Sequence, residues 1–115
     1  MTVKQRETID FVVHDPGRDE ALLILVQDEA WGESGRQLPA LEAKLNTYFA
    51  YVTEGRLVID HPTFAGKGIH VQLRATTPPG GRELEFLSIV AVHHLQPARI
   101  RLSWKVIGED DVHDV

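Results

Sequence analysis

Apolar and polar residues alternate in three short segments of the chain, and alternation with a period of two predicts β-strands. These segments are residues 9–13, 69–73 and 100–106. A fourth segment, residues 21–26, is apolar at every position, so a strand here would present apolar side chains on both of its faces. The short segment 15–20 contains proline and glycine, which predicts a turn that joins the first two strands in an antiparallel hairpin.

Two longer segments carry apolar residues at steps of three and four, which is typical of amphipathic helices. The first predicted helix covers residues 37–54, and Gly55 follows it as a C-cap. Its apolar stripe consists of Leu38, Leu41, Leu45, Phe49 and Val52. The second helix covers residues 82–95 and is expected to end before Pro97. Residues 56–60 are expected to form a short strand or an extended connector.

The resulting order is β-β-α-β-α-β, which predicts an α+β fold of two layers with both helices packed on one sheet. The 115 residues provide enough chain for a single domain, which is expected to span residues 1–107. Residues 108–115 contain four of the 17 acidic residues and no lysine or arginine. A charged segment with so few apolar residues predicts a disordered acidic tail.

The composition excludes several classes of protein and of site. The chain has no cysteine, so it forms no disulfide, no thiolate nucleophile and no cysteine-based metal site. Its longest apolar run, residues 21–26, is too short to span a bilayer. The first ten residues lack the apolar core of a signal peptide, which predicts a cytoplasmic protein.

Several stretches carry a resemblance to a known family. They are the acidic–tryptophan turn DEAW at 28–31, the helix LEAKLNTYFAYVTEGRL at 41–57 and the segment EFLSIV at 85–90. Together they resemble an uncharacterised family of small bacterial proteins, a domain of unknown function, whose helix follows the pattern Leu-x-x-Lys-Leu-Asn-x-Tyr. The similarity covers most of residues 8–107. The family has no assigned activity, so the resemblance implies a fold and no catalytic residue.

Six histidines invite the hypothesis of a metal site, but their spacing does not favour one. A zinc-binding pair on a helix is usually three or four residues apart, so that both rings reach one face. His93 and His94 are adjacent and would point about 100° apart on a helix. The sequence therefore predicts no metal site and no cofactor, and the histidines are expected to be solvent-facing or hydrogen-bonded.

A possible polar site lies at Asp28 and Glu29, which stand just before Trp31 at the end of the second predicted strand. Two carboxylates in a cleft can act as acid and base when their surroundings separate their pKa values. The simpler interpretation is that they cap or solvate a loop. No catalytic motif is present, so no catalytic residue is predicted and a nonenzymatic role is favoured. The alternative is a small hydrolase-like or metal-dependent enzyme that uses these carboxylates and a histidine.

Basic residues mark the polar side of the last two long strands: Arg74, Arg99, Arg101 and Lys105. If these strands are neighbours, their common face could bind an anion or a nucleic-acid backbone. No aromatic residue interleaves with these bases, so the stacking platform of single-strand binders is missing. Nucleic acid is therefore an unlikely partner, and a solvated outer sheet face is the expected state.

The second helix carries more apolar residues than one buried face requires. Phe86 and Ile89 are expected on the side opposite Leu84 and Leu87, with Val90 on the flank. Either the loop at 56–68 folds over this side or another chain covers it. We therefore expect a noncatalytic protein-interaction module that forms a homodimer, or binds another protein, through Phe86, Ile89 and Val90.

Overall fold

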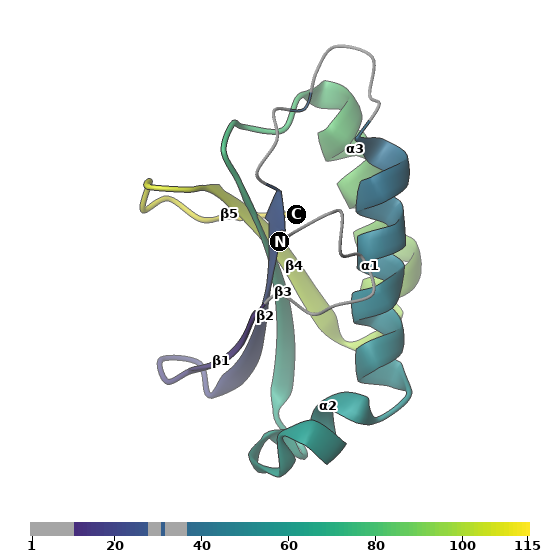
Figure 1. Ribbon diagram of the computed structural model, residues 1–115, viewed down its shortest axis with the longest axis vertical. Coiled ribbons are helices and arrows are strands. Elements are labelled where there is room, and N and C mark those ends of the chain that lie inside the picture. The colour runs from purple at the N-terminus through teal and green to yellow at the C-terminus, as the bar shows by residue number, and fades with distance from the viewer. Residues whose placement is uncertain (1–10, 28–30, 32–36) are drawn as a thin grey trace.

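Five strands form one mixed sheet, and the described helices all lie on one of its faces (Figure 1). The computed structural model describes residues 11–27, 31 and 37–115. The strands are β1 (Phe11–Asp15), β2 (Glu20–Gln27), β3 (Gly68–Ala75), β4 (Ile100–Val106) and β5 (His113–Asp114), and they lie in the sheet in this order. The three central strands are parallel to one another, and both edge strands are antiparallel to their neighbours.

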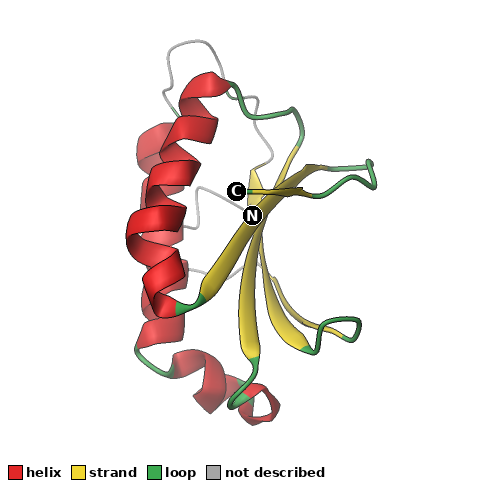
Figure 2. Ribbon diagram, turned by 180° about the vertical axis from the view of Figure 1, so that it is seen from behind, coloured by secondary structure: helices red, strands yellow, loops and turns green. Residues whose placement is uncertain are grey.

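Three α-helices cover the sheet: α1 (Leu38–Thr53), α2 (Arg56–Asp60) and α3 (Gly81–Val90). A π-helical turn, Ala91–Leu95, and a 3₁₀ turn, Gln96–Ala98, extend α3 towards β4. The crossovers from β2 to β3 and from β3 to β4 step in the same direction across the sheet. Crossovers of the same hand then place α1 and α3 on the same face (Figure 2). The predicted α+β fold with both helices on one sheet is confirmed.

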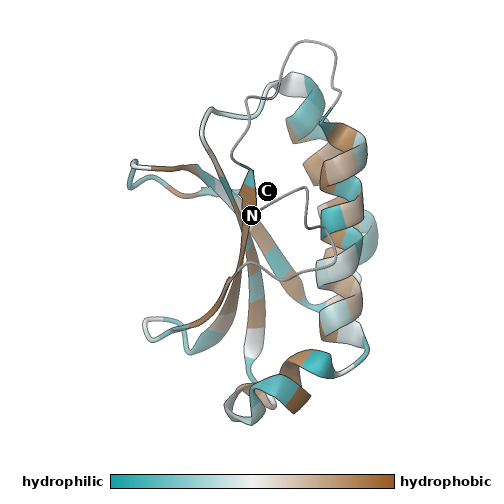
Figure 3. Ribbon diagram, viewed as in Figure 1, coloured by the Kyte–Doolittle hydropathy of each residue, from teal (hydrophilic) through white to brown (hydrophobic). Residues whose placement is uncertain are grey.

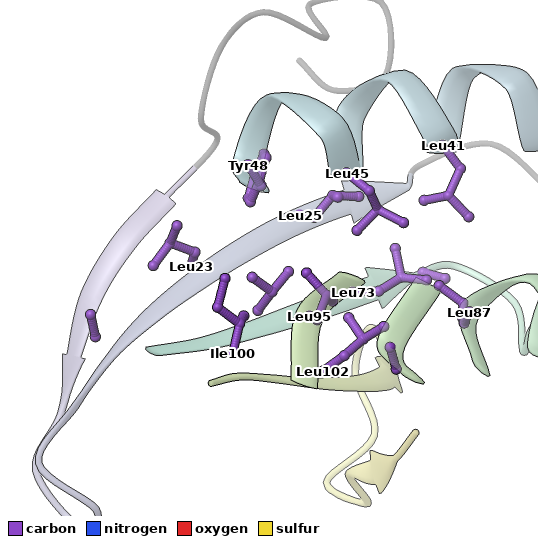
Figure 4. Close-up of a cluster of buried hydrophobic side chains, with 14 of the residues drawn as sticks. Leu23, Leu25, Leu41, Leu45, Tyr48, Leu73, Leu87, Leu95, Ile100 and Leu102 are labelled. Atoms are coloured by element: carbon purple, nitrogen blue, oxygen red, sulfur yellow. The ribbon is translucent and has the colours of Figure 1, made fainter. Parts of the chain in front are cut away.

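The core lies between the sheet and the helices (Figure 4). Alternate residues of the central strands point towards the helices, and they meet residues from the predicted stripe of α1 and from one side of α3. The labelled members are Leu23, Leu25, Leu73, Ile100 and Leu102 from strands, and Leu41, Leu45, Tyr48, Leu87 and Leu95 from helices. The stripe predicted from the sequence therefore marks the buried side of α1.

Residues 56–60 form the helix α2, so the expectation of a strand or an extended connector is wrong. Gly55 has a φ of +81°, a left-handed conformation that glycine adopts without strain. This residue ends α1 and lets the chain turn directly into α2, whose Leu57 is buried. Phe64, which follows in a short 3₁₀ helix, is also buried in the core. This segment thus packs into the core and leaves Ile89 of α3 half-exposed.

Residues 108–115 were expected to form a disordered tail, but the chain returns along β4 and forms β5. The ring of His113 stacks on Trp104 at a centroid distance of 4.2 Å. The backbone N–H of Val115 donates a hydrogen bond of 3.0 Å to the carbonyl oxygen of Leu102. Backbone pairing and one ring contact hold this segment. Neither interaction needs apolar residues at regular intervals, so the sequence pattern does not indicate this strand.

Replacing Leu45 by alanine is expected to destabilise the protein by about 2–5 kcal/mol, because it empties a buried position between α1 and the sheet. Glu42→Ala, at an exposed position one turn earlier, serves as the matched control and should change the free energy of unfolding by less than about 0.5 kcal/mol. Chemical denaturation measures both changes. Equal costs for the two variants would contradict the assignment of the buried stripe.

Deleting residues 109–115 is expected to lower the free energy of unfolding by more than about 1 kcal/mol, because it removes the pairing of β5 and exposes Trp104. His113→Ala removes only the ring contact and should cost part of this amount. Urea titrations of the three proteins test this. An unchanged midpoint for the truncated chain would show that β5 adds no stability.

Candidate functional site

The predicted polar site is only partly within the described residues. Asp28 and Glu29 lie outside them. Trp31 is buried in the core, and its indole Nε1–H donates a hydrogen bond of 3.0 Å to the carbonyl oxygen of Thr77, after β3. The ring therefore ties the connection after β2 to the connection after β3, which is a structural role.

Lys44 is fully buried on the inner side of α1. Its Nζ lies 5.8 Å from the centre of the Tyr48 ring, and the Tyr48 hydroxyl donates a hydrogen bond of 2.7 Å to the carbonyl oxygen of Ile24. Gln27, the last residue of β2, is buried as well. Lys44, Tyr48 and Gln27 each take part in a further interaction within the protein.

The sheet face that is turned away from the helices carries the most distinctive arrangement of side chains. We call it the open face. Its apolar half, on β1 and β2, consists of Phe11, Val13, Leu22, Ile24 and Val26. Its polar half, on β3 and β4, consists of His70, Gln72, Arg74, Arg101, Ser103 and Lys105. The last two long strands are neighbours, as the hypothesis of a common basic face required.

His70 and Ser103 form a buried hydrogen bond in the polar half, with 2.6 Å between Nε2 and Oγ. Burial away from water, and then the nearby Arg101 guanidinium, lower the pKa of His70 below its ordinary value of 6.5. The imidazole Nδ1 has no hydrogen-bond partner among the described residues. A nucleophilic serine needs solvent access and a base that a carboxylate orients. Ser103 is fully buried, so this pair joins β3 to β4 and is not an active site.

An ion pair crosses the sheet beside His70. The Arg101 guanidinium on β4 reaches over β3 to the Glu20 carboxylate on β2, with 2.6 Å between Nη1 and Oε1. Gly68 lies below this contact, and a Cβ there would come within 3.1 Å of the Glu20 carboxylate. Arg101 also lies 3.8 Å from Asp114 on β5. The ion pair therefore neutralises one of the four bases of the predicted anion site.

None of the other three bases has an acidic partner in the described part of the chain, and two of the three are neighbours. Arg74 and Lys105 are register partners on β3 and β4, and both side chains point to the open face. The Arg74 Nε–H donates a hydrogen bond of 2.8 Å to Gln72, which is neutral. Arg99 lies before β4 in a left-handed turn, with a φ of 62°. The predicted basic cluster is thus reduced to one adjacent pair of cations.

The predicted interaction residues lie at a pocket of about 170 Å³ between α1 and α3. Phe86 and Val90 line it from α3 and are half-buried, while Ile89 next to them is 50% exposed. The remaining lining residues are Glu42, Leu45, Asn46, Phe49, His94 and Leu95. Phe49 was identified in the sequence only as part of the stripe of α1. Its partial exposure makes it one wall of this pocket, which has apolar sides and polar groups at its margin.

Within residues 11–27, 31 and 37–115, no three histidine, aspartate or glutamate side chains gather as ligands of a metal ion would. No described helix combines the length and apolar character needed to cross a membrane.

Comparison of the chain with models of protein families found a match. The family model of DUF6572, described as a family of unknown function, matches residues 1–108. It confirms the resemblance to an uncharacterised family. No curated protein matches the chain. No solved structure matches it either.

Lowering the pH from about 7.5 to about 5.5 is expected to lower the melting temperature through His70. The folded protein keeps this ring neutral below pH 6.5, whereas the unfolded chain binds a proton there, so stability is lost as the pH falls from 6.5 towards the lower pKa of the folded state. The charged groups around His70 are Arg101, Glu20, Asp114 and Arg18.

The His70→Gln variant retains a hydrogen-bonding group for Ser103 but does not titrate, so its melting temperature should depend less on pH in this range. His93→Gln, on the exposed π-helical turn, is the matched control and should keep the wild-type pH dependence. Thermal unfolding followed by circular dichroism at several pH values measures the slopes. Identical slopes for all three proteins would contradict a role for His70.

Proposed function

We propose that this chain, which belongs to the DUF6572 family, is a noncatalytic protein-interaction module that forms a homodimer. The observation that carries this proposal is the pair of exposed apolar side chains, Phe11 and Val13, that the edge strand β1 presents on the open face. Phe11 is 57% exposed and Val13 is 41% exposed, and their neighbours on β2 are the buried Ile24 and the half-buried Leu22. An apolar group of this kind at the surface of a soluble domain is typical of a contact with another chain.

The energetic argument concerns the side chains that water contacts. A large apolar side chain contributes about 1.5–3 kcal/mol when it is fully buried. Phe11 and Val13 realise only part of this amount in a single chain, because no described helix covers the open face (Figure 3). A second copy that covers the same face would recover the remainder on both chains. A twofold dimer is the commonest form of such an assembly.

The pocket between α1 and α3 supports a second contact, with a different protein. A cavity of about 150 Å³ lined by Leu, Ile and Phe side chains can hold benzene. The pocket of about 170 Å³ therefore has room for one apolar side chain of a partner. Phe86 and Val90 would contact this side chain, and Ile89 would extend the contact beyond the pocket.

Light scattering at micromolar concentration is expected to give twice the 12.9 kDa mass of one chain. The double variant Phe11→Glu/Val13→Glu should be a folded monomer, because it places two charges in the apolar half of the open face. Phe86→Glu places a charge on the helix side and is the matched control, which should remain dimeric. A wild-type mass of one chain would refute the homodimer, and a monomeric Phe86→Glu variant would move its interface to the helix side.

A further inference from the structure

The hairpin between β4 and β5 carries surface groups that complement the open face. We call residues 107–112 the acidic hairpin. Its tip contains Glu109, Asp110 and Asp111, all exposed, and none of them forms an ion pair within the described residues. Its two arms carry Ile107 and Val112, each 48% exposed. It therefore combines unpaired acids with apolar side chains that water contacts.

The acidic hairpin projects from the sheet on the side away from the helices, which is the side of the open face (Figures 1 and 2). It follows directly from the end of β4 that carries Lys105. Its turn includes Gly108, whose φ of +90° is in the left-handed region. The hairpin and the open face are thus presented to the same side of the molecule.

Arg74 and Lys105 are the groups on the open face that such a hairpin would meet. They are register partners on adjacent strands, and like charges directly opposite each other destabilise a sheet. An acidic group placed between them would remove this repulsion. The acids of the same chain form no ion pair with either cation, although the hairpin begins only two residues after Lys105.

We propose that the acidic hairpin of one chain docks on the open face of a second copy, with its acids against Arg74 and Lys105 and its apolar arms against the apolar half. This inference rests on the proposed homodimer and assigns its interface. Because hairpin and face lie on the same side of each chain, a twofold axis allows both contacts to form at once. The dimer then has two equivalent contacts, each made of one hairpin and one face.

The test exchanges the charges of the two contacting groups. The face variant is Arg74→Glu/Lys105→Glu, and the hairpin variant is Glu109→Lys/Asp110→Lys/Asp111→Lys. Each variant alone opposes like charges across the interface, so its dimer dissociation constant should rise about 10- to 100-fold. In an equimolar mixture, acidic hairpins meet basic faces and basic hairpins meet acidic faces. The mixture should therefore regain dimers with an affinity near that of the wild type.

The control variant Arg56→Glu/Arg82→Glu makes the same change of charge at exposed positions of α2 and α3. It should dimerise as the wild type does, and circular dichroism confirms that each variant is folded. A monomeric wild type would refute the homodimer itself. A wild-type dimer whose affinity neither charge reversal changes would refute only the hairpin contact. Two monomeric variants that fail to combine in the mixture would also refute it, because complementary charges would then not restore binding.

Discussion

The parallel pairing of β3 with both of its neighbours is the constraint on which the rest of this structure depends. Parallel neighbours must be joined by crossovers, and two crossovers of one hand that step in one direction place their helices on the same face. The helices therefore cover one side of the sheet, and β2, which is apolar on both sides, is left with apolar residues on the open face. The open face, with its apolar and polar halves, therefore exists because the helices cover only one side of the sheet.

Two side-chain contacts link the strands within the polar half of the open face and its margin. His70 contacts Ser103, and Arg101 reaches Glu20 across the strand that carries Gly68. A larger residue than glycine at position 68 would obstruct this ion pair. These contacts join strands that are distant in sequence. In the apolar half, Phe11 and Val13 remain exposed to water, and a second chain that covered them would stabilise this part of the face.

Much of the fold could be predicted from the sequence, because apolar periodicity records which side of an element is buried. The stripe of α1 and the alternating faces of β3 and β4 were predicted in this way. The five-residue α2 could not be predicted, because a helix of this length is too short to show the spacing of apolar residues that is typical of helices. Two-residue β5 is held by backbone pairing and one ring contact, and its sequence is mostly polar. The burial of Lys44 could not be predicted either, because a charged residue beside an apolar stripe is typical of the flank of a helix, whereas here the whole side chain is inside.

The candidate sites were predictable only as far as they are local. Phe86, Ile89 and Val90 are close in sequence, so their common surface could be expected before the structure was known. The position of Arg74 beside Lys105 depends on strand order. Arg101 is removed from the predicted anion site because it pairs with Glu20, and this contact spans three strands. The two proposed surfaces lie on opposite sides of a two-layer fold. A dimer formed through the open face would therefore leave the pocket between α1 and α3 accessible on each chain, so the proposed self-association would not compete with the proposed binding of another protein.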